Sequence, residues 1–276
     1  MQTVSENLCF GGVQGVYSHA SDACGCDMTF GLYLPPAAKD GPVPVLWYLS
    51  GLTCTHENAM TKAAAQGFAA EAGMAVVFPD TSPRGADVAD DDAYDLGKGA
   101  GFYVNATQEP WAPHFRMWDY VSTELPALLG TEFAVDLGRQ AITGHSMGGH
   151  GALTLAMANP GRFASVSAFA PIANPMQSDW GRKQLSAYLG DDEDSWTRHD
   201  ATGQMTLVGF NGPVLVDQGG SEQFLDLLKP EALAHAMVAR RQDGVFRMQK
   251  GYDHSYFFVS TFIPDHIAFH AEALGL

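Results

Sequence analysis

The chain has 276 residues, 46% of them hydrophobic and 17% charged, which is the composition of a globular protein with a sizeable core. Its formal net charge of −16 argues against nucleic acid and anionic membrane surfaces as partners, because both would repel it. No composition break, repeat or low-complexity tract divides the chain, so we expect a single domain over residues 1–276.

The amino terminus has neither the basic start nor the apolar stretch of a signal peptide, and no apolar run approaches the roughly 20 residues of a membrane span. Without a secretory signal, the four cysteines are expected to be free thiols. Cys24 and Cys26 have no second Cys or His pair at zinc-ligand spacing, so no metal site is expected. The sequence predicts a soluble, cytoplasmic protein.

The first half of the chain alternates predicted strands and helices. Residues 27–34 are a predicted strand that Pro35 and Pro36 end, and residues 10–17 could pair with it as an antiparallel hairpin. Residues 44–49 and 74–79 are continuous apolar runs, typical of strands covered on both faces, and an alanine-rich helix is expected between them at 58–72. Strand, helix and strand in this order indicate a parallel sheet with helices on its faces.

The second half continues the same pattern after a long stretch, residues 80–110, that is rich in Gly and Asp and has little periodicity. Loops of that length inside a domain are usually functional or flexible. Residues 171–200 are also expected to be irregular. The remaining predicted strands are 140–143, 163–169, 214–217 and 245–248, and the predicted helices are 114–129, 152–158, 230–241 and 256–273.

The segment Gly144-His145-Ser146-Met147-Gly148 stands between a predicted strand and a predicted helix. Strand, Gly-x-Ser-x-Gly and helix are typical of a nucleophile elbow, a tight turn that exposes a serine at the carboxyl edge of a sheet. Gly144 and Gly148 supply the lack of bulk that so tight a turn needs. The helix N-terminus would face negative charge developing near Ser146. The sequence therefore predicts Ser146 as a catalytic nucleophile.

A serine hydroxyl needs a base in hydrogen-bond contact, and the base needs an acid that orients it. The chain order in this kind of site is serine, then aspartate or glutamate, then histidine. Among the ten histidines, His254 lies downstream of Ser146 at the end of a predicted strand, in a Gly-x-Asp-His turn. We predict His254 as the general base.

Three carboxylates near the end of the strand at 214–217 are candidates for the acid. Asp217 stands at the strand terminus, where a carboxylate often caps a neighbouring loop, and Asp226 is expected to face away. Glu222 lies in a loop that can reach toward His254, and a glutamate can perform the same task as an aspartate. Glu222 is the predicted acid, with Asp217 as the alternative.

A tetrahedral intermediate also needs two N–H donors for its oxyanion. One is expected from the residue after the nucleophile, Met147, and the other from the loop after the early buried strand. That loop is Gly51-Leu52-Thr53, so we predict the Leu52 N–H as the second donor.

These motifs together resemble the S-formylglutathione hydrolases, also called the esterase D family, over nearly the whole chain. The resemblance implies an α/β-hydrolase fold, with a mostly parallel central sheet flanked by helices. It also implies cleavage of the thioester of S-formylglutathione to formate and glutathione in formaldehyde detoxification, with a Ser-Asp-His triad, no metal and no other cofactor. The blocks that carry it are 49–55, 79–85, 99–103, 144–153, 167–172, 217–219 and 251–256.

Ser146 and His254 fall on the family's matching positions, whereas the family's aspartate before Gln-Phe-Leu is replaced here by Glu222. The resemblance further implies that Cys54 lies beside the active site, that Trp180 walls the acyl pocket, and that the protein forms a homodimer. In the loop after Trp180, the adjacent basic residues 182 and 183 are candidates for binding glutathione carboxylates.

Two other functions stay open on the same fold. One is a general carboxylesterase for short-chain esters, or an acyltransferase that passes the acyl group to an alcohol. The other is a catalytically inactive relative used for binding, against which the intact Ser146 and His254 argue.

Overall fold

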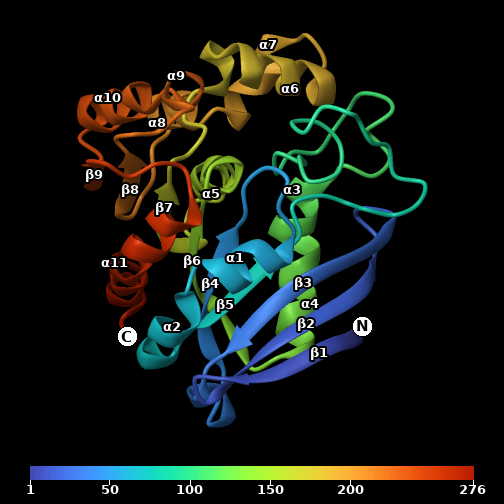
Figure 1. Ribbon diagram of the computed structural model, residues 1–276, viewed down its shortest axis with the longest axis vertical. Helices are drawn as coiled ribbons and strands as arrows, with labels where there is room; N and C mark the ends of the chain where they lie inside the picture. Colours follow the sequence, from blue (N-terminus) through green and yellow to red (C-terminus); the bar gives the residue numbers. More distant parts are fainter.

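The computed structural model describes all residues 1–276 and contains a nine-stranded sheet in the order β1-β2-β3-β5-β4-β6-β7-β8-β9 (Figure 1). Strands β4 to β9 run parallel to their neighbours, whereas β1, β2 and β3 pair antiparallel, and β3 joins β5 antiparallel. The strands are β1 (Gln2–Cys9), β2 (Gly12–Ser21), β3 (Cys26–Leu34), β4 (Val43–Leu49), β5 (Ala75–Pro79), β6 (Val135–Gly144), β7 (Phe163–Phe169), β8 (Val214–Gly219) and β9 (Gly244–Gln249).

Helices connect the parallel strands. They are α1 (His56–Lys62), α2 (Ala65–Ala72), α3 (Met117–Asp119), η2 (Tyr120–Glu124), α4 (Leu125–Glu132), α5 (Met147–Ala158), α6 (Asp179–Leu189), α7 (Glu193–Trp196), α8 (Ala201–Leu207), α9 (Leu225–Leu228), α10 (Pro230–Arg240) and α11 (Tyr256–Leu274), with short turns η1 (Pro36–Lys39), η3 (Pro175–Gln177) and η4 (Thr197–His199). The predicted fold class, a mostly parallel sheet flanked by helices, is confirmed. No helix is both long and apolar enough to cross a membrane.

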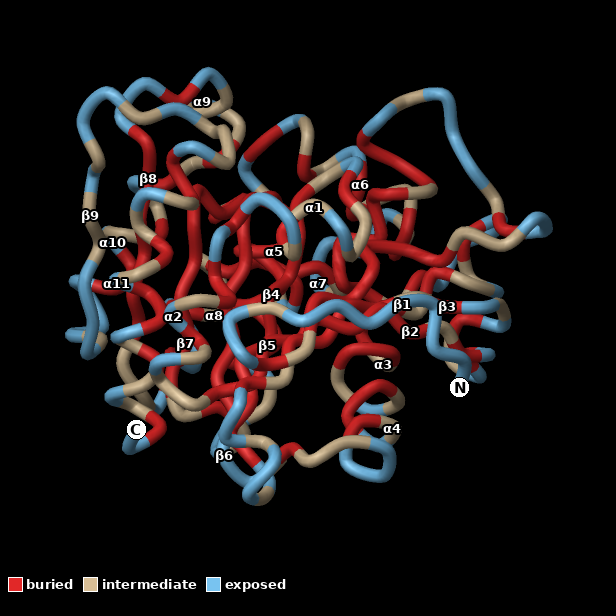
Figure 2. Tube along the Cα trace, turned by 60° about the horizontal axis from the view of Figure 1, so that its bottom comes forward, coloured by how far each residue is buried: buried red, intermediate tan, exposed pale blue.

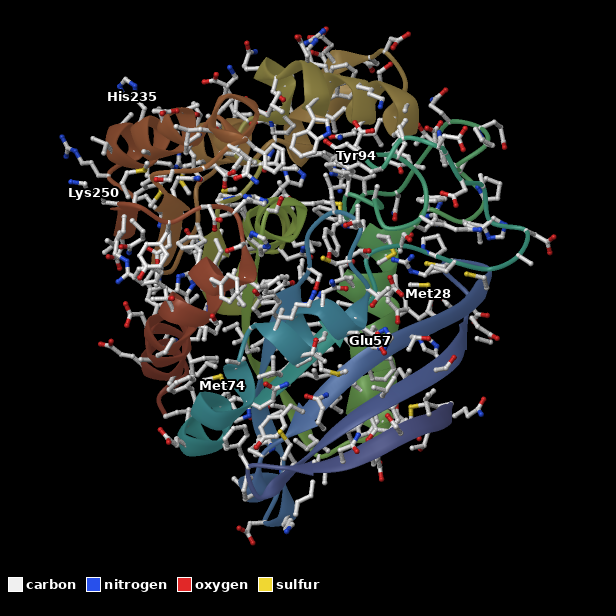
Figure 3. The ribbon with its side chains drawn as sticks, in the orientation of Figure 1. Met28, Glu57, Met74, Tyr94, His235 and Lys250 are labelled. Carbon is white, nitrogen blue, oxygen red and sulfur yellow. The ribbon has the colours of Figure 1, made fainter.

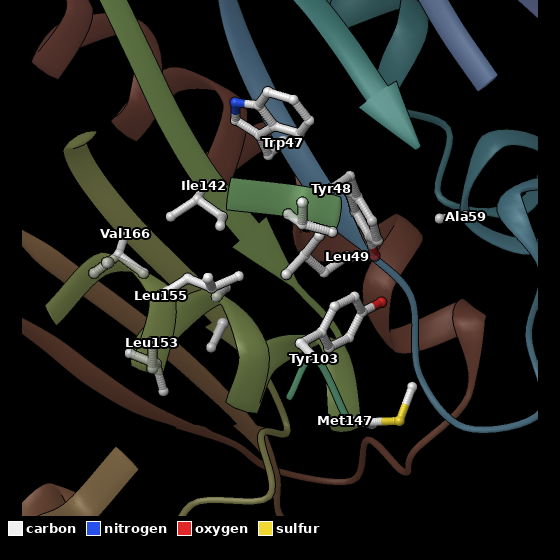
Figure 4. Close-up of a cluster of buried hydrophobic side chains, with 14 of the residues drawn as sticks. Trp47, Tyr48, Leu49, Ala59, Tyr103, Ile142, Met147, Leu153, Leu155 and Val166 are labelled. Carbon is white, nitrogen blue, oxygen red and sulfur yellow. The ribbon is translucent and has the colours of Figure 1, made fainter. Parts of the chain in front are cut away.

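Helices cover both faces of the sheet at β7, because alternate residues of a strand point to opposite faces. Ser165 and Ser167 bond to α11, and Phe169 stacks on a histidine of that helix. Val166, whose side chain points to the opposite face, lies near Leu155 of α5 (Figure 4). The sheet is therefore packed between α11 on one face and α5 on the other, next to the end of β6 that leads to Ser146.

The buried interior runs through the central strands. Strands β4 and β5 are buried along their whole length, whereas β1 at the sheet edge is exposed (Figure 2). A single cluster of 70 buried hydrophobic residues joins the sheet to its helices, which supports our proposal that residues 1–276 form one domain.

Two regions differ from the sequence prediction. The helix expected at 58–72 is interrupted between α1 and α2, where Ala64 has a φ of 59°. Buried Gln66 stabilises the break, because its side-chain amide donates to the Met60 carbonyl and to Gln14. The prediction of an irregular segment at 171–200 was wrong, since α6 begins there at a Ser178 cap whose hydroxyl accepts from Gly181 N–H.

Five histidines are buried as neutral rings, which makes the stability of the fold depend on pH. Burial lowers the pKa of each of them, to about 4 for His150 and to about 3 for His199. The unfolded chain would bind protons at these rings near pH 6.5, whereas the folded chain would not. The free energy of unfolding should therefore fall as the pH drops below about 6.5. The five are His145, His150, His199, His266 and His270.

We expect urea unfolding midpoints to decrease from pH 7.5 to pH 5, with each neutral ring contributing up to about 1.4 kcal/mol per pH unit below its unfolded pKa. His235 is a matched control, since it is exposed on α10 and points away from the molecule (Figure 3). His235→Gln should leave this pH dependence unchanged. An unfolding midpoint that stays constant over this range would contradict the prediction.

Candidate active site

Ser146 stands between the end of β6 and the start of α5, in a strained backbone conformation with φ 59° and ψ −118°. A side chain at Gly144 would collide with the Gly148 carbonyl, and one at Gly148 would collide with the Leu49 carbonyl. The Ser146 N–H donates to the Phe169 carbonyl of β7 at 2.9 Å. Both glycines are thus required by close backbone approach, and the turn has the geometry of a nucleophile elbow.

His254 and Glu222 come from loops after neighbouring strands, β9 and β8, and are in direct contact. His254 Nδ1 lies 2.5 Å from Glu222 Oε2, and the second oxygen of Glu222 accepts from the Phe224 N–H at 2.9 Å. The Glu222 side chain is fully shielded from solvent, whereas that of His254 is 14% exposed. The carboxylate therefore fixes the ring through Nδ1 and leaves Nε2 for another partner.

Ser146 and His254 line the same cavity, of about 270 Å³, but no hydrogen bond joins the Ser146 hydroxyl to the ring in this structure. Such contacts are often long before substrate binds and shorten in the reacting complex. The predicted pocket residues Leu52, Cys54 and Trp180 line this cavity too. Its other lining residues are Gly51, Thr53, Tyr94, His145, Phe224, Ser255 and Tyr256.

The aromatic wall of the cavity comes from segments far apart in sequence. Tyr94 belongs to the long irregular stretch and lies below α6 (Figure 3), with its ring centre 6.3 Å from that of Trp180. Trp180 in turn lies 6.0 Å from Phe224, which meets the His254 ring edge-on at 5.3 Å. Sequence analysis missed Tyr94, Phe224 and Tyr256, because single aromatic residues in loops carry no signal of their position.

His145 also lies in the cavity wall, and both of its ring nitrogens lack a hydrogen-bond partner. Its ring centre is 4.5 Å from that of His254. Burial, followed by the nearby His254, lowers the pKa of His145 well below its usual value. A neutral ring is thus packed against His254.

Two backbone N–H groups beside Ser146 have no acceptor. Thr53 N–H donates to Gly99 O at 2.9 Å and Gly148 N–H donates to His145 O at 2.8 Å, whereas Leu52 N–H makes no backbone hydrogen bond. Met147 is the first residue of α5, where N–H groups have no intrahelical acceptor. These two donors are available to an oxyanion.

Asp217, the alternative acid, is engaged elsewhere. Its carboxylate accepts from Arg247 at 2.7 and 2.5 Å, from Gln249 at 2.8 Å, and contacts His266 Nε2 at 3.0 Å. Burial opposes its charged form, but the hydrogen bonds from His266 and Arg247 outweigh burial and lower the pKa of Asp217 to about 2. Asp217 therefore holds β8, β9 and α11 together and does not contact His254.

The remaining polar candidates do not belong to the group formed by Ser146, His254 and Glu222. Asp226 is exposed on α9. Arg182 pairs with Glu193, and Lys183 Nζ lies 2.7 Å from Asp95, so both cations have acidic partners already. No group of three or more His, Cys, Asp and Glu side chains is arranged to hold a metal ion.

Cys54 is a free thiol in the cavity wall. Burial, its largest influence, raises the pKa of this thiol, which keeps it protonated near neutral pH. Its backbone carbonyl accepts from Thr81 and Arg84, and so the loop that carries it is fixed. Cys54 is therefore a wall residue that carries little of the reactive thiolate form.

Comparisons with known proteins agree with this geometry. Residues 21–269 match the family model described as "Putative esterase". The chain is 69% identical over 274 residues to an S-formylglutathione hydrolase of Paracoccus denitrificans (strain Pd 1222), covering 99% of this chain and 98% of that protein. An S-formylglutathione hydrolase structure from Agrobacterium tumefaciens aligns with a TM-score of 0.97 at 50% identity over all of both chains.

The fold extends to more distant proteins. A fluorophosphonate-binding serine hydrolase from Staphylococcus aureus aligns with a TM-score of 0.75 at 18% identity, covering 94% of this chain and 98% of that one. At this identity, the likeness shows a shared fold alone.

Proposed function

Since this chain belongs to the esterase family and, within it, to the S-formylglutathione hydrolases, we propose that it hydrolyses the thioester of S-formylglutathione to formate and glutathione. The observation that carries the chemistry is the Glu222–His254 contact beside a serine held in a strained elbow. That arrangement supplies an oriented base for a hydroxyl nucleophile, which is what acyl transfer needs.

In the first half-reaction, Ser146 Oγ attacks the formyl carbonyl and His254 Nε2 takes the hydroxyl proton. Glu222 holds the ring through Nδ1 and stabilises the imidazolium that forms. The Leu52 and Met147 N–H groups donate to the oxyanion, and loss of one such donor typically costs about 10²–10³ in rate. The intermediate collapses, the C–S bond breaks, and His254 Nε2 gives its proton to the departing sulfur, so that glutathione leaves as the thiol and the ring is neutral again.

In the second half-reaction, His254 removes a proton from water, which attacks the formyl ester on Ser146. The second tetrahedral intermediate collapses to formate and restores the serine hydroxyl with the proton from His254. The cavity volume of about 270 Å³ and its ring of aromatic residues support a small acyl group, formyl or acetyl, over long chains.

We also propose that the protein acts in the cytoplasm, in formaldehyde detoxification, on a small-molecule substrate and without nucleic acid. Four free cysteines support a reducing compartment. A homodimer is proposed as well, and the exposed Leu8 and Phe10 at the β1 edge of the sheet are available to a second copy.

The function is tested by comparing kcat/KM for S-formylglutathione with that for 4-nitrophenyl acetate, measured by loss of thioester absorbance and by release of nitrophenol. We expect the higher value for S-formylglutathione, because contacts to the peptide moiety contribute to transition-state binding. Equal values for both substrates would favour a general short-chain carboxylesterase. Faster turnover with added alcohol, and ester as product, would indicate an acyltransferase.

A further inference from the structure

S-formylglutathione poses an electrostatic problem for this chain. Its γ-glutamyl end carries both a carboxylate and an ammonium group, which offset each other, whereas its glycine carboxylate has no internal counter-charge. The protein has a formal net charge of −16, so the field of the whole molecule repels such a substrate. A local cation should therefore lie where the glycine end binds.

Most basic side chains near the cavity are already neutralised. Arg84 pairs with Asp80 at 3.0 Å, Lys183 pairs with Asp95, and Arg182 pairs with Glu193. Lys62, the last residue of α1, makes no ion pair and no side-chain hydrogen bond. It is exposed and its charge is free to meet an anion.

Lys62 borders a second cavity that adjoins the one at Ser146. This cavity has a volume of about 440 Å³ and is lined by Lys62, Ser255, Tyr256, Phe257 and Ser260. Ser255 and Tyr256 line both cavities, so the two adjoin at the residues that directly follow His254.

Distances and charge effects place the Lys62 ammonium at this boundary. Its Nζ lies 6.0 Å from the centre of the Tyr256 ring. Its charge also acts on the Cys54 thiol, where it opposes the larger effect of burial on the thiol pKa. Lys62 is the only lysine or arginine in the linings of the two cavities.

We propose that the second cavity is the subsite for the glutathione moiety, and that the Lys62 ammonium pairs there with the glycine carboxylate while the formyl thioester lies at Ser146. This inference rests on the proposed function. The first cavity holds the acyl group and the sulfur, and the tripeptide extends past Ser255 and Tyr256. Phe257, which is 85% exposed, forms an apolar wall for the glycine methylene. The hydroxyls of Ser255 and Ser260 donate to Asp253 and to the Phe257 carbonyl, and their oxygens can accept from peptide N–H groups of the tripeptide.

The first test is Lys62→Ala, assayed with S-formylglutathione and with the neutral 4-nitrophenyl acetate. We expect kcat/KM for S-formylglutathione to fall about fivefold through a higher KM, as the loss of a solvent-exposed ion pair predicts. Lys62→Glu should lose more and Lys62→Arg should retain most of the value. The neutral ester, which has no carboxylate, should be hydrolysed at the wild-type rate by all three variants.

Lys39→Ala is the matched control, because Lys39 is also an exposed lysine but lies away from the site. It belongs to η1, just before the amino end of β4, whereas the carboxyl end of β4 leads to the site. This variant should leave both substrates unaffected. Wild type should hydrolyse S-formylglutathione amidated at glycine with a lower kcat/KM than S-formylglutathione itself. Lys62→Ala should hydrolyse the amide with the same lowered kcat/KM, since the amide and the alanine remove the same ion pair.

An equal loss for the charged and neutral substrates, or an unchanged KM for S-formylglutathione, would overturn this subsite. If wild type showed no preference for S-formylglutathione, the proposed function would fail, which is a different result. If Lys62→Ala lowered kcat/KM for the glycine amide as much as for S-formylglutathione itself, the Lys62 contact would be to the γ-glutamyl carboxylate. That result would contradict the assignment.

Discussion

Glu222→Gln is expected to lower kcat for S-formylglutathione by about 10⁴-fold while leaving the fold intact, as amide replacement of the acid does in a Ser-His-Asp triad. The glutamine keeps the shape of the buried side chain and its oxygen can still accept from the Phe224 N–H. It cannot stabilise an imidazolium at His254. Its NH₂ group would also face Nδ1–H as donor to donor, in place of the hydrogen bond that the carboxylate now accepts. Single-turnover and steady-state rates measure the loss, and circular dichroism checks the fold.

Asp226→Asn is the control for this result, since Asp226 is a nearby carboxylate exposed on α9. It should retain wild-type kcat. Near-normal activity of Glu222→Gln would reject Glu222 as the acid of the triad.

Asp217→Asn should instead reduce stability, by about 3 kcal/mol, with little loss of kcat in the folded protein. The substitution leaves the Arg247 guanidinium without its buried charge partner and with only the exposed Asp265, and removing one member of a buried pair typically costs about 3–5 kcal/mol. The lower figure applies because the Arg247 side chain is 30% exposed and water can replace part of the interaction. Urea unfolding at pH 7 measures the difference.

The pH dependence of that difference follows from the pKa of Asp217, which is about 2 in the folded protein and about 3.9 in an unfolded chain. The stabilisation is complete above pH 4 and is lost as the pH falls toward 2. Asp265→Asn is the control, because Asp265 contacts the same guanidinium at 2.8 Å but is 54% exposed, and it should cost less than about 1 kcal/mol. Equal losses for the two aspartates would show that burial does not decide the effect.

The Glu222 and Asp217 variants separate the predicted acid from its alternative, a choice that the sequence supports only through loop position and resemblance. Asp217 and Glu222 both follow the apolar run of β8, and a strand end brings either side chain to the same sheet edge. What distinguishes them is Arg247 on β9, which holds Asp217 at the strand, and this pairing depends on strand register. The position of Ser146 was easier to predict, because the two close-packed glycines and the strand–helix context are local features.

Other features of the fold depend on tertiary packing and left no sequence signal. His266 and His270 are spaced one helical turn apart on α11, a spacing that suits a surface face as well as a buried one. In the structure both are fully buried and bond to Ser167, whose hydroxyl donates to Thr143 Oγ1 at 2.7 Å. Similarly, the alanine-rich stretch at 58–72 predicts an unbroken helix, and the break becomes evident only from the contacts of Gln66.

The most direct test is to label the protein with one equivalent of a fluorophosphonate, digest it, and locate the modified residue by mass spectrometry while residual S-formylglutathione hydrolysis is measured. We predict modification at Ser146, loss of activity in proportion to labelling, and no labelling of Ser146→Ala. Full activity in protein modified at Ser146, or inactivation by a label at another residue, would contradict a covalent mechanism based on the Ser146, His254 and Glu222 side chains.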